Sequence, residues 1–80
     1  MKVTLNVFLK EGILDPQGKA TAHALEVMGF EGVNGVRIGK QIVLDLACSD
    51  EVSARAEAEK MASDLLVNGV IEEYTIEVAA

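Results

Sequence analysis

The feature that most constrains the fold of this chain is a strict alternation of side chains near its N-terminus. From Lys2 to Leu9, one side of an extended chain carries Val3, Leu5, Val7 and Leu9, and the other side carries Lys2, Thr4, Asn6 and Phe8. A period of two in a segment rich in β-branched residues is typical of a strand with one buried face. The segment is therefore predicted to be a half-buried strand that ends before Glu11-Gly12.

A helix is predicted to begin at Asp15-Pro16 and to end at Gly29. Aspartate is a favoured N-cap and proline fits the first helical position, whereas glycine readily takes the left-handed angles that end a helix. Gly18 in the first turn lowers helix propensity by about 1 kcal/mol relative to alanine, which is explained if a backbone or a partner comes close there. One broad face of this helix consists of Ala20, Thr21, Ala24, Leu25, Val27 and Met28.

A second helix is predicted to open at Ser49-Asp50-Glu51, where a capping oxygen precedes early negative charge, and to end at Asn68-Gly69. Its predicted buried stripe consists of Ala54, Ala58, Met61, Ala62 and Leu65. The segment from Ile71 to Val78 alternates again and is predicted to be the last strand, with Tyr74, Ile76 and Val78 on one face.

Between the two helices, residues 33–38 and 41–47 are predicted to form a β-hairpin around Gly39-Lys40. A two-residue turn with glycine first suits the type II′ geometry. In the second of these strands, Ile42, Leu44 and Leu46 share one face. The first strand has the weaker pattern, because Gly35 interrupts it.

The predicted elements follow the order β-α-β-β-α-β within a single domain, residues 1–80. Since each helix is amphipathic on one side only, the predicted fold is an α+β two-layer sandwich, ferredoxin-like or a close variant: a four-stranded, mainly antiparallel sheet with both helices on one face. A chain this short hides only about 60% of the surface its unfolded form exposes. Because 50% of the residues are hydrophobic, part of the apolar surface is expected to lie against another chain.

Composition excludes several functions and indicates the compartment. The formal net charge is -6 and no lysine–arginine cluster is present, which argues against a nucleic-acid partner. The opening residues do not form a signal peptide, and no apolar run approaches the roughly 18 residues of a membrane span. The single cysteine, Cys48, suits a reducing compartment. A cytoplasmic protein with no membrane partner is therefore expected.

Candidate catalytic groups are scarce in this sequence. Cys48 has no neighbouring base and is interpreted as a small buried hydrophobe, and His23 has no second metal ligand four residues away. Glu57, Glu59 and Asp64 are interpreted as solvating the second helix. No catalytic residue, cofactor or metal ligand is assigned to this chain, although a pair of carboxylates brought together by folding stays open as an alternative.

Four motifs, in order, resemble those of the PurS family. They are the run from Leu9 to Ala20, then His23-Ala24-Leu25 with Met28-Gly29-Phe30, then Val36-Arg37-Ile38-Gly39-Lys40, and finally the run from Asn68 to Tyr74. The resemblance covers essentially the whole chain. Two departures are Gly69 and Glu11, which stand where the family usually has proline, and they affect the expected stiffness of two turns.

The resemblance implies a non-catalytic subunit of phosphoribosylformylglycinamidine (FGAM) synthase, the glutamine-dependent, ATP-consuming C–N ligase (EC 6.3.5.3) of purine biosynthesis. In that family the chain bridges a PurL-type synthetase subunit and a PurQ-type glutaminase subunit and supports ammonia transfer. ATP and Mg²⁺ are expected on the synthetase subunit, with no cofactor in this chain. The resemblance also implies self-association as a homodimer or tetramer.

The residues expected to contact the partners are Lys10, Asp15, Pro16, Gln17, Gly18, Arg37, Gly39 and Lys40. The alternative, that Asp15-Pro16 only caps a helix and Gly39-Lys40 only forms a turn, stays open. Two other functions also stay open. One is a dimeric, ferredoxin-like regulatory domain that binds a small molecule, which a ligand-dependent rise in stability would reveal. The other is a free-standing small enzyme.

Overall fold

The computed structural model describes residues 1–79 and shows an elongated α+β molecule of 49 × 26 × 14 Å. Its elements, in chain order, are β1 (Lys2–Leu9), α1 (Pro16–Val27), β2 (Lys40–Asp45), α2 (Glu51–Met61), the π-helical turn η1 (Ala62–Leu66) and β3 (Glu72–Ala79). In the described residues, no helix is both long enough and apolar enough to cross a membrane.

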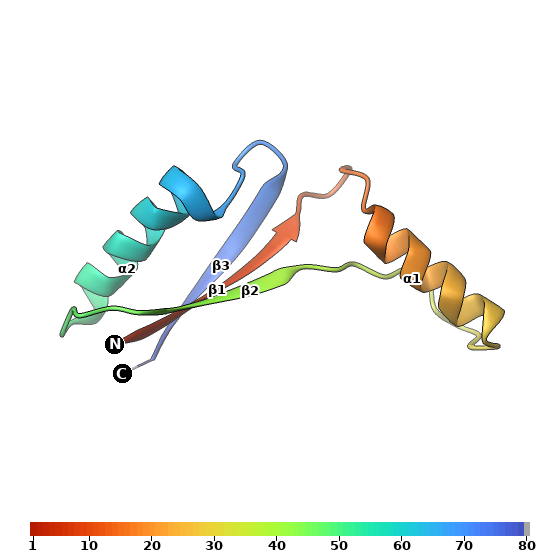
Figure 1. Cartoon of the computed structure of the whole chain (residues 1–80), viewed down its shortest axis with the longest axis horizontal. Helices are drawn as coiled ribbons and strands as arrows, with labels where there is room; N and C mark the ends of the chain where they lie inside the picture. Colours follow the sequence, from red (N-terminus) through yellow and green to blue (C-terminus); the bar gives the residue numbers. More distant parts are fainter. Residues whose placement is uncertain (80) are drawn as a thin grey trace.

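The described strands form one antiparallel sheet in the order β2-β1-β3 (Figure 1). Leu5 of β1 lies opposite Ile42 on one side and Ile76 on the other. The alternation seen in the sequence is confirmed, because Val3, Leu5 and Val7 are almost completely buried on one face while Phe8 on the other face is 40% exposed. Strand β1 is central because its neighbours carry the same alternation in matching register.

Helix α2 covers the apolar face of the sheet with alanines. Ala54, Ala58 and Ala62 are fully buried and pack with the core of β1. The predicted stripe was wrong for two larger residues, since Met61 is 37% exposed and Leu65 is 84% exposed. The π-helical turn explains Leu65: Val67 N–H donates to the carbonyl of Ala62 (2.9 Å), and this wider turn rotates the following side chains out of the α-helical pattern.

Helix α1 does not lie on the sheet, so the prediction that both helices cover one face was wrong. Figure 1 shows α1 beyond the end of the strands, at the opposite end of the molecule from the two termini. After α1, residues 30–39 return to the sheet without regular structure. Gly18 is buried against this returning segment, at the carbonyl of Val36. The first turn of α1 therefore packs on its own return path and not on the strands.

The predicted hairpin is also absent from residues 1–79. Strand β2 begins only at Lys40 and pairs with β1, and residues 33–38 belong to no strand. A type II′ turn requires a positive φ at its first central residue, but the described glycines with positive φ are Gly12, Gly29 and Gly32, not Gly39. Gly39 instead continues the chain past Val7 and Phe8. Within the described part of the chain, the sheet consequently has three strands where four were predicted.

Candidate interaction site

Most of the residues predicted to contact partners meet at one place, the junction between the sheet and α1. The loop before α1 and the end of the returning segment lie together there, although more than 20 residues separate them in sequence. They border a recess of ≈ 320 Å³ lined by Val7, Leu9, Asp15, Pro16, Gln17, Ile38, Gly39, Lys40 and Glu72. That partners bind at this junction stays a prediction.

Asp15 is the centre of the junction. One carboxylate oxygen, Oδ1, accepts a hydrogen bond from the Gly18 N–H (2.8 Å), which caps α1. The other oxygen, Oδ2, accepts from the Ile38 N–H (3.0 Å) in the returning segment. The bond from Ile38, followed by that from Gly18, lowers the pKa of Asp15 below its ordinary value, because both donors favour the charged carboxylate.

Two glycines allow the backbone segments of the junction to come together. A Cβ atom at Gly18 would overlap the carbonyl oxygen of Val36. A Cβ atom at Gly39 would overlap the carbonyl oxygen of Val7 and lie 2.6 Å from Cδ1 of Phe8. The close approach expected from Gly18 in the sequence is therefore confirmed, whereas Gly39 serves packing and not a turn.

The basic residues of the predicted set contact their own chain. The Arg37 guanidinium donates to the carbonyl of Leu9 and lies 5.8 Å from the centre of the Phe8 ring. Lys40 Nζ is 3.7 Å from a carboxylate oxygen of Glu72, and Lys10 Nζ donates to the Gly69 carbonyl (2.7 Å). These side chains hold the end of the sheet together, while Pro16 and Gln17 are exposed.

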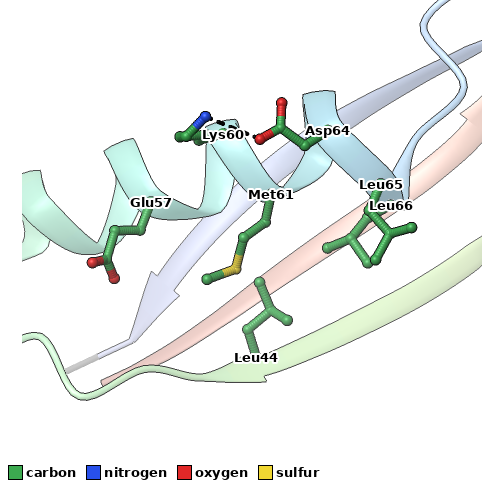
Figure 2. A pocket seen from close by; sticks show the side chains of 7 residues that line it. All are labelled: Leu44, Glu57, Lys60, Met61, Asp64, Leu65 and Leu66. Carbon is green, nitrogen blue, oxygen red and sulfur yellow. Dashed lines mark hydrogen bonds and ion pairs between the residues drawn. The ribbon is translucent and has the colours of Figure 1, made fainter.

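A second candidate surface, which the sequence did not reveal, is an apolar groove beside α2. It has a volume of ≈ 460 Å³ and is lined by Leu44, Glu57, Lys60, Met61, Asp64, Leu65 and Leu66. Figure 2 shows Met61 extending toward Leu44 of β2, with Leu65 and Leu66 at one end of the groove and Glu57 at the other. Lys60 and Asp64 pair with each other at 3.0 Å on the outer side of the helix. The predicted sandwich would have placed α1 beside α2 on this face of the sheet.

Helix α1 and the residues just beyond it carry an exposed apolar surface, which the sheet of the same chain does not cover and which is complementary to the apolar groove. Val27 and Met28 are more than 70% exposed, and Phe30 just beyond the helix is 56% exposed. Before the helix, Leu14 is 63% exposed. The sequence pattern identified the apolar face of α1, but only the fold shows that the sheet of the same chain does not cover it.

The polar side chains with possible chemistry are dispersed. The Cys48 thiol donates to Glu57 Oε2 (2.7 Å), and this bond is the main cause of a pKa above the ordinary value for a thiol. His23 lies exposed on α1. Among residues 1–79, no group of three or more histidine, cysteine, aspartate or glutamate side chains is placed to hold a metal ion.

Comparisons by family model, by sequence and by structure all match this chain to PurS proteins of FGAM synthase. The sequence model of the family described as "PurS: Phosphoribosylformylglycinamidine (FGAM) synthase" matches residues 2–80. The PurS subunit of FGAM synthase from Bacillus subtilis is 46% identical over 77 residues, which are 96% of this chain and 90% of that protein.

Two solved structures have the same fold as this chain. A structure of Bacillus subtilis PurS aligns with a TM-score of 0.88 at 44% identity, over 99% of this chain and 98% of the other. A chain in the structure of PurLQS from Thermotoga maritima aligns with a TM-score of 0.86 at 31% identity, over 95% of this chain and 93% of that one.

Proposed function

Because this chain belongs to the PurS family of FGAM synthase subunits, we propose that it is a non-catalytic subunit of that enzyme in purine biosynthesis. In this role it holds a PurL-type synthetase and a PurQ-type glutaminase together. The observation that carries the proposal is the match along 95% of the chain to a chain in a structure of PurLQS. ATP and Mg²⁺ would bind to the synthetase subunit.

The physical contribution of such a subunit is positioning. The reaction converts formylglycinamide ribonucleotide, ATP and glutamine into formylglycinamidine ribonucleotide, ADP, phosphate and glutamate. Ammonia released at the glutaminase has to reach the synthetase before it is protonated or diffuses away. Transfer therefore works only while the two subunits stay docked and water is excluded between them. The exposed Pro16 and Gln17 at the junction are the first candidates for partner contact.

The second part of the proposal is that two copies associate, each placing α1 over the sheet of the other. The apolar groove beside α2 lies open, with Leu44, Met61 and Leu65 on its walls. The apolar face of α1 cannot reach the groove of its own chain, because the helix extends beyond the end of its own sheet (Figure 1). An exchange of α1 helices about a twofold axis would cover both grooves at once.

Two sheet edges support a further step of assembly. Strands β2 and β3 form the edges of the sheet, and neither has a second strand beside it within residues 1–79. Edge strands offer unpaired N–H and C=O groups to another chain. Pairing of one edge between two dimers would produce a tetramer, so dimer and tetramer are successive states of the same proposal.

The test of the subunit function is a reconstitution with the PurL-type and PurQ-type proteins of the same organism, in the presence of glutamine and Mg-ADP. FGAM synthesis is measured with glutamine and with ammonium as the nitrogen donor, each with and without this chain. We expect the glutamine-dependent rate to collapse without the chain, while the ammonia-dependent rate survives. Full glutamine-dependent activity of the other two subunits alone would overturn the proposal.

A further inference from the structure

Asp15 makes one more hydrogen bond than a helix cap requires. Capping of α1 uses Oδ1, which accepts from the Gly18 N–H at 2.8 Å. Oδ2 accepts from the Ile38 N–H at 3.0 Å, from a segment 23 residues further along the chain. Asp50, which caps α2, provides a contrast because its Oδ2 accepts from the Ser53 N–H at 2.9 Å, three residues away. Asp15 thus joins two separate segments, whereas the capping bond of Asp50 is local.

The returning segment is held from both sides at this point. On one side, Val36 packs against the first turn of α1, where Gly18 leaves room for its carbonyl oxygen. On the other side, the Arg37 guanidinium donates to the carbonyl of Leu9 at the end of β1. Residues 36–38 therefore lie between the start of α1 and the end of the sheet. The bond from Ile38 to Asp15 closes this arrangement.

We infer that Asp15 is a positioning residue for self-association: its link to Ile38 fixes the direction in which α1 leaves the sheet. This inference rests on the proposed exchange of α1 between two copies. The rest of α1 stands clear of the strands (Figure 1) and is bordered by residues 29–33 of the returning segment, so its direction relative to the sheet is set at the junction. The junction would then decide where the apolar face of α1 meets the groove of the second copy.

The geometry of the helix makes this position sensitive. With 12 residues and a rise of about 1.5 Å per residue, α1 is about 18 Å long. A change of about 20° in its direction at Asp15 would move its far end by about 6 Å, more than one turn's pitch. A displacement of that size withdraws Val27 and Met28, at the end of the helix, from any contact they make with a second copy.

The substitution Asp15→Asn removes the hydrogen bond from Ile38 but keeps the capping bond from Gly18. Asparagine caps helices about as well as aspartate, so its single amide oxygen can still accept from the Gly18 N–H. The amide nitrogen that replaces the second oxygen is a donor and cannot accept from Ile38. Asp50→Asn is the matched control, because it makes the same chemical change at the cap of α2. If Asp15→Asn does not fold, Asp15→Ser serves the same purpose, with one capping oxygen of shorter reach.

The first measurement is the dimer dissociation constant of the full chain by sedimentation equilibrium. Loss of a hydrogen bond to a charged group in both copies is expected to raise the constant at least about tenfold for Asp15→Asn. The constant for Asp50→Asn should stay within about twofold of the unchanged chain. If the unchanged chain dimerises and Asp15→Asn dimerises equally tightly, the inference is overturned, while the proposed dimer stands. A wild-type chain that stays monomeric overturns the exchange of α1, and with it the consequence proposed for Asp15.

The second measurement distinguishes positioning from stability alone. Spin labels are attached through Glu31→Cys beyond α1 and Thr75→Cys on β3, in a Cys48→Ser background, and the labelled chain is diluted into unlabelled chain. We expect Asp15→Asn to broaden the distance distribution between the labels, while Asp50→Asn leaves it narrow. A residue that only stabilised the fold would lower the unfolding midpoint without broadening the distribution, and that result would count against the inference.

Discussion

Gly18 and Gly39 lie at two points where separate backbone segments meet with no room for a side chain. The helix propensity lost at Gly18, about 1 kcal/mol relative to alanine, is offset by the contact between α1 and Val36 that it permits. The sequence identified this position correctly, since a glycine inside a capped helix has no local purpose. At Gly39 the local pattern indicated a turn, because the approach of Val7 and Phe8 cannot be seen from neighbouring residues.

Gly18→Ala is therefore expected to destabilise the chain even though alanine favours the helix. The new Cβ would overlap the Val36 carbonyl oxygen, and overpacking of this kind costs about 1–3 kcal/mol, more than the propensity gained. Urea unfolding measures the change in free energy. The control is Gly35→Ala, where a Cβ would have nothing within 4 Å and the expected change is close to zero. Equal stability of the two variants would contradict the close packing at Gly18.

The thiol of Cys48 is expected to react slowly because of Glu57. Their hydrogen bond and the carboxylate charge raise the pKa of the thiol, so less reactive thiolate is present near pH 8. Replacing the carboxylate by Glu57→Gln should lower this pKa and speed alkylation by iodoacetamide several-fold, with Glu59→Gln as the control. Rates measured from pH 7 to 10 give the pKa directly. An unchanged pH profile in Glu57→Gln would show that Glu57 does not act on the thiol.

The same pKa shift has a defined sign for stability. A thiol whose pKa is higher in the folded chain than in the unfolded chain favours folding as long as it is protonated in both states. That contribution is present at neutral pH and is lost as the pH rises through the raised pKa. Asp15 and Asp50 have the opposite shift, so their contribution is present at neutral pH and is lost as the pH falls through their lowered pKa values.

At the scale of elements, the two helices show how similar sequence patterns lead to different packing. Both begin at an aspartate N-cap, and both were predicted to cover the sheet. Helix α2 does so because Ala54 and Ala58, continued by Ala62 of η1, let it approach β1 closely. Helix α1 is held at its first turn by the returning segment and leaves the sheet. An amphipathic pattern indicates that a face will be covered, but not which surface covers it.

Leu65→Asp is expected to weaken the proposed dimer. Leu65 lies on the groove beside α2 and is 84% exposed in the single chain. In the dimer its side chain would be covered by the partner's α1, where an unpaired carboxylate is costly. The control is Val52→Asp, which adds the same charge to an apolar residue of α2 that is 79% exposed outside the groove. Sedimentation velocity should show monomers for Leu65→Asp only, and equal dimer content in both variants would exclude the groove as the interface.

The turn before β3 offers a prediction in the opposite direction, toward higher stability. The Ile71 N–H donates to the Asn68 carbonyl (3.1 Å), so Gly69 is the second residue of a four-residue turn. Proline is favoured at this position, and Gly69 has neither a positive φ nor an atom near its Cβ position. Gly69→Pro should therefore stabilise the chain by about 0.5–1 kcal/mol, chiefly by restricting the unfolded state.

The measurement is again urea unfolding, with Gly12→Pro as the control. Gly12 has a φ of 84°, which proline cannot adopt, so this variant should be less stable than the unchanged chain. A loss of stability in Gly69→Pro comparable to that in Gly12→Pro would mean that the turn needs the freedom of glycine. It would also show that the local departure from the family pattern has a structural reason.

At the scale of the whole molecule, the core is small and the shape is extended. The largest fully buried side chains are Leu5, Val3 and Val7, all from β1. A core of this size leaves little margin of stability in a short chain. Two apolar surfaces stay open, the groove beside α2 and the face of α1, and these two helices lie at opposite ends of the molecule (Figure 1). Stability should therefore depend on association with a second copy.

The melting temperature is accordingly expected to rise with protein concentration. For unfolding of a dimer of 80-residue chains, a tenfold increase in concentration should raise Tm by about 4 °C, given about 2.1 cal/mol/K of unfolding entropy per residue. Calorimetry over two decades of concentration measures this slope. Leu65→Asp should remove the dependence. A Tm of the unchanged chain that does not vary with concentration would show that it folds and melts as a monomer.

The sequence by itself determined the features that depend on near neighbours. The alternation in β1 and β3 set which side chains are buried, Asp15 and Asp50 set where the helices begin, and the four motifs identified the family. The tertiary structure alone decided that residues 33–38 form no strand, that Leu65 is exposed and that α1 leaves the sheet. The physical reason is the range of the interactions involved. Periodicity and capping depend on residues within a few positions of each other. Which surface covers an apolar face depends on all the surfaces that the folded chain can bring against it.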